Sequence, residues 1–209
     1  MHEDGLDPFP PPDQYQTPID PKKIKERIRR YERALKKEKE RYGAYRDGSG
    51  KRFLLGPFYM ILGDLDGAMQ SFAWFEASFP GGLIESPQLL CWSLALLRSG
   101  EEHDAREMLR RTMFANLYII PRLLGMEVQC HDIWHCSNKG APSYLSWVPD
   151  EYWALWDKSE LQWARNLWEG DEFRKAREQY IELRHKLKSL RPGPERSSVV
   201  DEMQKLRDG

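Results

Sequence analysis

The stretch from Phe53 to Pro80, FLLGPFYMILGDLDGAMQSFAWFEASFP, decides the fold class. It contains two apolar runs, each long enough for a helix, and Gly63 lies between them. Within each run the apolar residues recur every three or four positions, which is the period of an α-helix. The stretch therefore predicts two antiparallel helices joined by a tight turn at Gly63.

The pattern of this helix pair occurs again further along the chain. Gly100 follows Gly63 at an offset of 37 residues, and the same offset aligns Ala105 with Ala68. Helix pairs of this kind stack, because one pair cannot bury its own apolar face. We therefore predict an all-α fold of antiparallel helix hairpins stacked as a short array, with units at about residues 52–80, 87–117 and 158–188. The third unit matches less well, since it has one extra residue between its glycine and its alanine.

Small and aromatic residues of the first unit follow a known repeat pattern. They are Leu55, Gly56, Tyr59, Gly63, Ala68, Phe72 and Pro80. In this pattern the chain resembles the tetratricopeptide repeat family, and Gly56 and Ala68 would let the two helices of the pair approach closely. The second unit departs from the pattern at Ser93, which stands where Gly56 stood. The resemblance implies a concave surface, made by the first helix of each pair, that grips an extended or helical peptide.

The register of the repeats predicts which side chains line this groove. They are Phe53, Pro57, Met60 and Ile61 in the first unit and Leu90, Leu94, Leu97 and Arg98 in the second. Because nearly all of them are apolar, we expect a groove that binds a short segment of a protein partner, with Arg98 orienting an acid of that partner. The chain's own segments should narrow the groove to a pocket near Met60, Leu94 and Arg98. The expected function is a non-enzymatic protein–protein interaction module or adaptor.

The segments around the repeats differ in composition. Residues 1–20 hold five acids, no Lys or Arg and a proline run, which predicts a disordered tail ahead of a helical domain at 21–190. Residues 118–157 break the period with Pro and Gly but contain four tryptophans, so they should form an irregular aromatic insertion that packs against the array. Residues 191–209 are expected to be a C-terminal tail with a short helix.

The first expected helix is amphipathic and basic. Asp20-Pro21 predicts its start, and Tyr42-Gly43 its end. Its apolar stripe is Ile24, Ile28, Tyr31 and Leu35. The segment from Lys22 to Arg46 holds twelve Lys or Arg against four Glu. This excess supports an alternative function, a nucleic-acid-binding adaptor, although a solvated helix face is the favoured interpretation.

One cluster, CHDIWHC at residues 130–136, contains metal-ligand types. On a helix His131 and His135 share a stripe with Glu127, but Cys130 and Cys136 are about 240° apart at 100° per residue. A metal-dependent hydrolase at this cluster is therefore a distant third function. No nucleophile elbow or dinucleotide fingerprint occurs, and we predict no catalytic residues, no metal, no cofactor and no small-molecule substrate.

The composition limits which further classes of protein the chain could belong to. The chain of 209 residues is 40% hydrophobic and 31% charged, with a net charge of −1, so its total charge favours neither nucleic acid nor a membrane surface. Its apolar runs are shorter than the roughly 20 residues that span a bilayer. Three cysteines cannot all pair within one chain, which favours a reducing, cytoplasmic location.

Overall fold

The computed structural model describes residue 17 and residues 20–45, 47–81 and 84–208. All regular secondary structure in these residues is helical, so the prediction of an all-α fold is confirmed. The expected tail at 1–20 lies outside the described residues except at positions 17 and 20.

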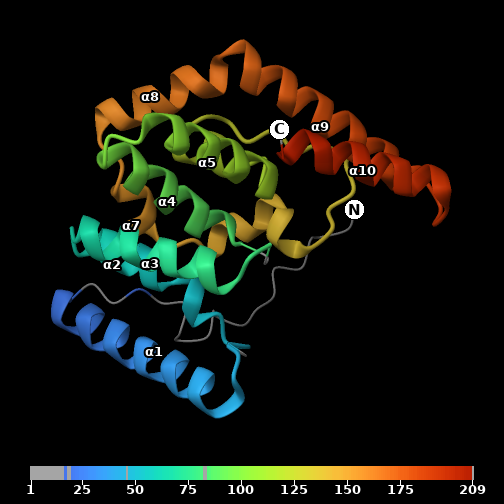
Figure 1. Ribbon diagram of the computed structural model, residues 1–209. Coiled ribbons are helices and arrows are strands. Elements are labelled where there is room, and N and C mark those ends of the chain that lie inside the picture. The colour runs from blue at the N-terminus through green and yellow to red at the C-terminus, as the bar shows by residue number, and fades with distance from the viewer. Residues whose placement is uncertain (1–16, 18–19, 46, 82–83, 209) are drawn as a thin grey trace.

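The helices follow one another as shown in Figure 1. In chain order they are α1 (Pro21–Tyr42), η2 (Lys51–Phe53), α2 (Leu55–Ile61), α3 (Leu65–Ser78), α4 (Ser86–Arg98), α5 (Glu102–Ala115), α6 (Ile119–Leu123), η3 (Asn138–Gly140), η4 (Pro142–Trp147), α7 (Asp150–Ala154), α8 (Lys158–Glu169), α9 (Asp171–Ser189) and α10 (Pro194–Asp208).

Two close helix pairs, α2–α3 and α4–α5, form the centre of the molecule. Gly63 and Gly100 end the first helix of each pair at positive φ, 70° and 80°, a conformation that glycine adopts without steric cost. Gly56 permits the close approach of α2 to α3, because a Cβ there would lie 2.2 Å from the ring of Phe72. In the second pair the hydroxyl of Ser93 donates a hydrogen bond of 2.8 Å to the carbonyl of Ala105.

α1 packs on one side of the first pair and lies below it in Figure 1. The carboxylate of Asp20 accepts a hydrogen bond from the Lys22 amide and so caps the helix, and Gly43 ends it at a φ of 69°, as predicted. The four residues of the apolar stripe are buried together with Leu55 and Phe58 of α2, as a cluster separate from the main core. The loop that follows is fixed by Asp47, whose carboxylate accepts from the amides of Lys51 and Arg52.

The irregular segment at 118–157 packs against the pairs, as predicted. Tyr118 is 1% exposed, Tyr152 is 2% and Trp156 is 5%. The side-chain amide of Asn116 donates to the carbonyl of Lys139 at 2.8 Å and holds the start of this segment. These three aromatic residues are therefore part of the core, and Trp134 and Trp153 are half-buried against it.

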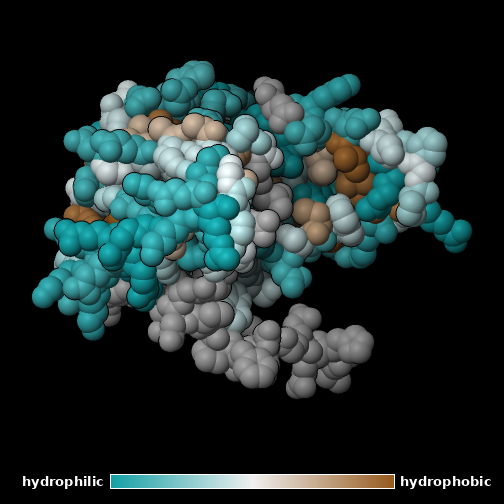
Figure 2. Space-filling view, turned by 60° about the horizontal axis from the view of Figure 1, so that its bottom comes forward, coloured by the Kyte–Doolittle hydropathy of each residue, from teal (hydrophilic) through white to brown (hydrophobic). Residues whose placement is uncertain are grey.

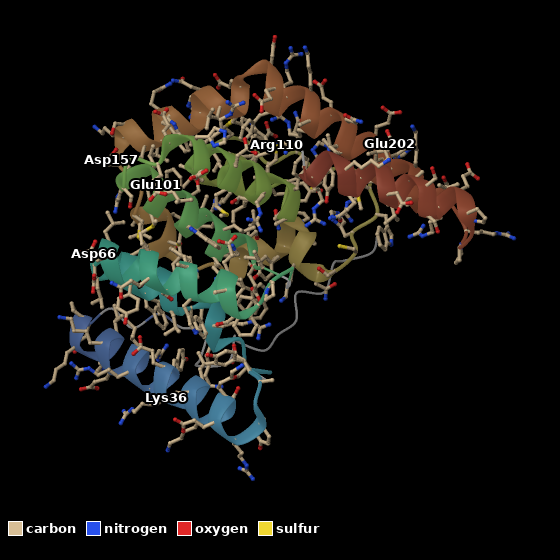
Figure 3. All side chains as sticks on the ribbon, in the orientation of Figure 1. Lys36, Asp66, Glu101, Arg110, Asp157 and Glu202 are labelled. Carbon is tan, nitrogen blue, oxygen red and sulfur yellow. The ribbon has the colours of Figure 1, made fainter. Side chains whose placement is uncertain are left out.

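α8 and α9 run across the top of the molecule in Figure 1, above α5, and α10 lies at the right, packed against α9. A capping box of Asp157 and Glu160 begins α8. Arg110 on α5 donates to the carbonyl of Leu206 on α10 at 2.6 Å, and Figure 3 shows Arg110 beside α10, which carries Glu202. The helix expected in the C-terminal segment is α10, which is 15 residues long and packs on the core through the buried Met203.

Candidate functional site

The apolar side chains predicted to line an open groove lie inside the protein. Met60 on α2 is 3% exposed, and Leu90 and Leu94 on α4 are 0% exposed. α4 contacts α2 and α3 as well as α5, so its neighbours cover it on several sides. The prediction that Met60, Leu90 and Leu94 face a partner is therefore wrong, because these residues form the core.

Arg98, which was expected to meet an acid of a partner, pairs with an acid of its own chain. Its Nε donates to Glu160 Oε1 at 2.7 Å, and its Nη2 donates to the carbonyl of Leu155 at 2.6 Å. The hydrogen bond to Glu160 raises the pKa of Arg98, so the guanidinium stays charged. The residue joins the end of α4 to the start of α8, and Met60 and Leu94 are buried, so the predicted pocket at these three residues is wrong.

The other predicted groove residues differ in how far they are buried. Pro57 is buried in α2, whereas Ile61 and Leu97 are half-buried against the core. Phe53 is also half-buried, with its ring centroid 5.8 Å from that of Phe75. Phe53 also lines a small cavity, together with Glu85 and Tyr152.

The Cys/His cluster at 130–136 is not helical, although the predicted alignment of His131 and His135 requires a helix. This segment has no helical structure, and His131 and His135 both lie against the ring of Tyr118, with centroids 5.9 and 6.0 Å away. Burial lowers the pKa of both histidines, and nearby arginines lower it further. Within the described residues, no three His, Cys, Asp or Glu side chains are grouped as metal ligands.

A cleft of about 470 Å³ opens between α1 and the α2–α3 pair, and we call it the α1 cleft. It is lined by Glu32, Leu35, Lys36, Lys39, Glu40, Tyr45, Leu55, Tyr59, Gly67, Gln70, Ser71 and Trp74. Leu35 and Leu55 are buried at its base, and Tyr45, Tyr59 and Trp74 are half-buried on its walls. Figure 3 shows Lys36 on α1, across from the α2–α3 pair that carries Asp66. A space of this size is typical of ligand and peptide sites.

The cleft exists because the apolar stripe of α1 is shorter than the helix. The last buried residue is Leu35, while the helix continues to Tyr42 through Lys36, Lys39 and Glu40, which are all exposed. These polar side chains line the cleft together with Gln70 and Trp74 of α3. On the opposite wall Gly67 adds space, because a Cβ there would lie 2.5 Å from the ring of Tyr59.

Hydrogen bonds hold the aromatic walls of the α1 cleft in place. The Tyr59 hydroxyl donates to Glu32 Oε1 at 2.7 Å, and the Trp74 indole donates to the Tyr45 hydroxyl at 3.3 Å. Burial and the hydrogen bond to Glu32 raise the pKa of Tyr59, so its hydroxyl keeps its proton. The Nζ of Lys39 lies 5.3 Å from the centroid of the Tyr45 ring, a cation–π contact. The walls are therefore ordered before any partner binds.

Sequence reasoning missed the α1 cleft, although one signal for it was present. The apolar stripe ends at Leu35 about two turns before the predicted end of the helix, which indicates a helix end without an apolar contact. The aromatic residues on the opposite wall, above all Trp74, belong to a different unit of the sequence. Their position opposite Lys36 and Lys39 follows only from the fold.

No family model, no curated protein and no solved structure matches the chain. Among the described residues, no helix combines the length and the hydrophobicity needed to cross a bilayer. The geometry of the chain itself is therefore the basis for assigning a function.

Proposed function

We propose that the protein is a non-enzymatic interaction module that binds a short, acidic segment of a protein partner in the α1 cleft. The observation that carries this proposal is an open cleft with a buried apolar base and aromatic walls, whose α1 rim carries Lys36 and Lys39 beside Glu32 and Glu40. The partner segment would place an apolar side chain between Leu55 and Trp74. Its acidic residues would meet Lys36 and Lys39.

The charge of α1 favours an acidic partner. The helix holds eleven Lys or Arg against four Glu, an excess of seven positive charges. Figure 2 views the molecule with the side of α1 turned forward, and hydrophilic residues predominate at the left front of this view. Such a local excess attracts an acidic segment over several ångströms and speeds its association, although the chain as a whole is nearly neutral.

We also propose that α2–α3, α4–α5 and α8–α9 form a tetratricopeptide-like array. The close contact at Gly56, the full burial of Ala68 and the repeated glycine turns support this for the first two pairs. In the repeat family the concave surface of the array binds peptides. Here that surface is filled, and the added helix α1 supplies a second place for a peptide to bind.

A peptide selection tests the proposed function. The full chain is presented with a library of random peptides, and we expect enrichment of segments in which an aromatic or branched apolar residue is flanked by Asp or Glu. The affinity of the best peptide should fall by about tenfold or more in Trp74→Ala, since burying one large aromatic contact is worth at least 1.4 kcal/mol. Selection of peptides without this pattern, or binding unaffected by Trp74→Ala, would contradict the proposal.

Matched charge variants distinguish the peptide from a nucleic acid. Lys36→Ala/Lys39→Ala removes two charges at the cleft, and Lys22→Ala/Lys25→Ala removes two exposed charges from the same helix at its other end. A peptide in the cleft should lose affinity in the first variant only. An RNA that bound more tightly than the peptide, and lost affinity equally in both variants with a steep dependence on salt, would support the nucleic-acid alternative instead.

A further inference from the structure

A second, smaller cavity of about 50 Å³ lies away from the α1 cleft. It is formed by the turn η2, the start of α4 and the segment from Tyr144 to Tyr152. Phe53, Tyr144, Trp147 and Tyr152 contribute aromatic rings to its lining, and Glu85 contributes a carboxylate. Aromatic faces next to a carboxylate are a favourable surrounding for a cation.

A cationic side chain of the protein already lies at this cavity. The ammonium of Lys139 is 2.6 Å from Glu85 Oε1 and 5.6 Å from the centroid of the Phe53 ring. The Tyr144 hydroxyl donates to the other oxygen of Glu85 and so orients the carboxylate. The Lys139 side chain is 53% exposed, whereas that of Glu85 is 17% exposed. The lysine is therefore the partner that can move away, while the carboxylate stays in the wall.

Two buried polar atoms in the lining have no hydrogen-bond partner among the described residues. Gln88 and Tyr152 are each 2% exposed, and these atoms are the Gln88 Oε1 and the Tyr152 hydroxyl. Burial raises the pKa of Tyr152, with smaller contributions from nearby groups that include Glu85, so the hydroxyl stays protonated. An unpaired acceptor in a buried wall is costly, and a ligand N–H would satisfy the carbonyl of Gln88.

We propose that this cavity, the amine pocket, binds a small alkylammonium group that carries at least one N–H. The group would displace the Lys139 ammonium from Glu85, lie against the rings of Phe53 and Trp147, and donate to Gln88 Oε1. An anion would meet the Glu85 carboxylate, and a metal ion would lack ligands, since the described residues contain no group of three metal-ligand side chains. The proposal does not depend on the α1 cleft.

Binding of dimethylammonium to the full chain tests the amine pocket. The titration is followed by calorimetry and by the indole N–H signal of Trp147, assigned with Trp147→Phe. Glu85→Gln should weaken binding about tenfold, because it removes the charge that pairs with the ligand. Lys139→Met should tighten binding several-fold, because it removes the competing ammonium. Lys188→Met is the matched control, since it removes another half-exposed lysine, one that pairs with Asp132 elsewhere, and it should leave binding unchanged.

Two further titrations define the ligand. Tetramethylammonium has no N–H and should bind several-fold more weakly than dimethylammonium; equal binding would overturn the role of Gln88. The affinity of free dimethyllysine is compared with that of a peptide that contains dimethyllysine. Tighter binding of the peptide would show that the alkylammonium group comes from a protein side chain. Equal binding would show that the ligand is a free amine. The proposal is overturned if none of these amines binds saturably, as expected of a cavity that holds only water, or if Glu85→Gln and Lys139→Met leave the affinity unchanged.

Discussion

Helices α4 and α1 bury their apolar residues in two different ways. Every residue of α4 from Ser86 to Leu96 is buried, so this helix is covered on all sides. α1 buries only the four residues of one stripe, and most of its other residues are exposed. A helix that is apolar all round belongs to the core, whereas a helix with a short apolar stripe lies at the surface and leaves space where the stripe ends. The candidate binding site lies at the second kind of helix.

The largest effect is expected from shortening a core side chain of α4. Leu94→Ala should lower the free energy of unfolding by about 2–5 kcal/mol, because Leu94 is fully buried and its removal leaves a cavity. Chemical denaturation measures the change. Gln70→Ala, on the exposed rim of the α1 cleft, is the control and should change stability by less than about 0.5 kcal/mol. If the two variants were equally stable, α4 would not be the central helix.

A smaller loss is expected from overfilling the contact between α2 and α3. Ala68→Leu should destabilise the protein by about 1–3 kcal/mol, because Ala68 is 0% exposed and has no room for three more carbons. Ala73→Leu makes the same change on the exposed side of the same helix. Thermal unfolding should separate the two variants clearly, and equal melting temperatures would show that the register of the pair is wrong.

The ion pair of Arg98 should contribute less to the free energy of unfolding than the core side chains do. A double-mutant cycle with Arg98→Ala and Glu160→Gln is expected to give a coupling energy of about 0.2–1 kcal/mol, because the arginine side chain is 32% exposed and water screens the pair. A coupling energy near zero would mean that the pair with Glu160 does not stabilise the fold, and that the hydrogen bond to the Leu155 carbonyl alone holds Arg98.

The two histidines beside Tyr118 should make a modest contribution to the pH dependence of stability. Burial holds the pKa of His131 and His135 below the ordinary value of 6.5, so the folded protein binds fewer protons there than the unfolded chain. Their stabilising contribution is complete above pH 6.5 and is lost as the pH falls through the lowered pKa. Melting temperatures at pH 7.5 and 5.5 should therefore differ less in His131→Gln/His135→Gln, while His103→Gln, an exposed histidine, should behave as the wild type.

The sequence predicted local structure well because local signals determine it. The capping residue Asp20, the end of α1 at Gly43 and the turns at Gly63 and Gly100 all lie where the pattern placed them. Each depends on a few adjacent residues whose conformational preferences are strong. The sequence also predicted that the apolar stripe of α1 is buried, because such a stripe is stable only when it packs against another apolar surface.

The sequence did not predict which apolar surface stays open, because that depends on contacts between distant segments. Leu94 is fully buried in a helix that contacts α2 and α3 as well as α5. Arg98 is paired because Glu160, 62 residues away, begins α8 beside it. The predicted alignment of the histidines in the Cys/His segment assumed a helix, whereas the chain there is irregular and packs on Tyr118.

The most direct test of the proposed site is a map of backbone amide shifts in the full chain, measured by NMR while the best selected peptide is added. The account predicts shifts concentrated at residues 32–45 of α1 and its loop and at Tyr59, Gln70 and Trp74, with little change in α4. The shifts at the cleft should disappear in Lys36→Ala/Lys39→Ala at the same peptide concentration and persist in Lys22→Ala/Lys25→Ala. Shifts centred on α4, or on the N-terminal half of α1, would contradict the assignment of the α1 cleft as the binding site.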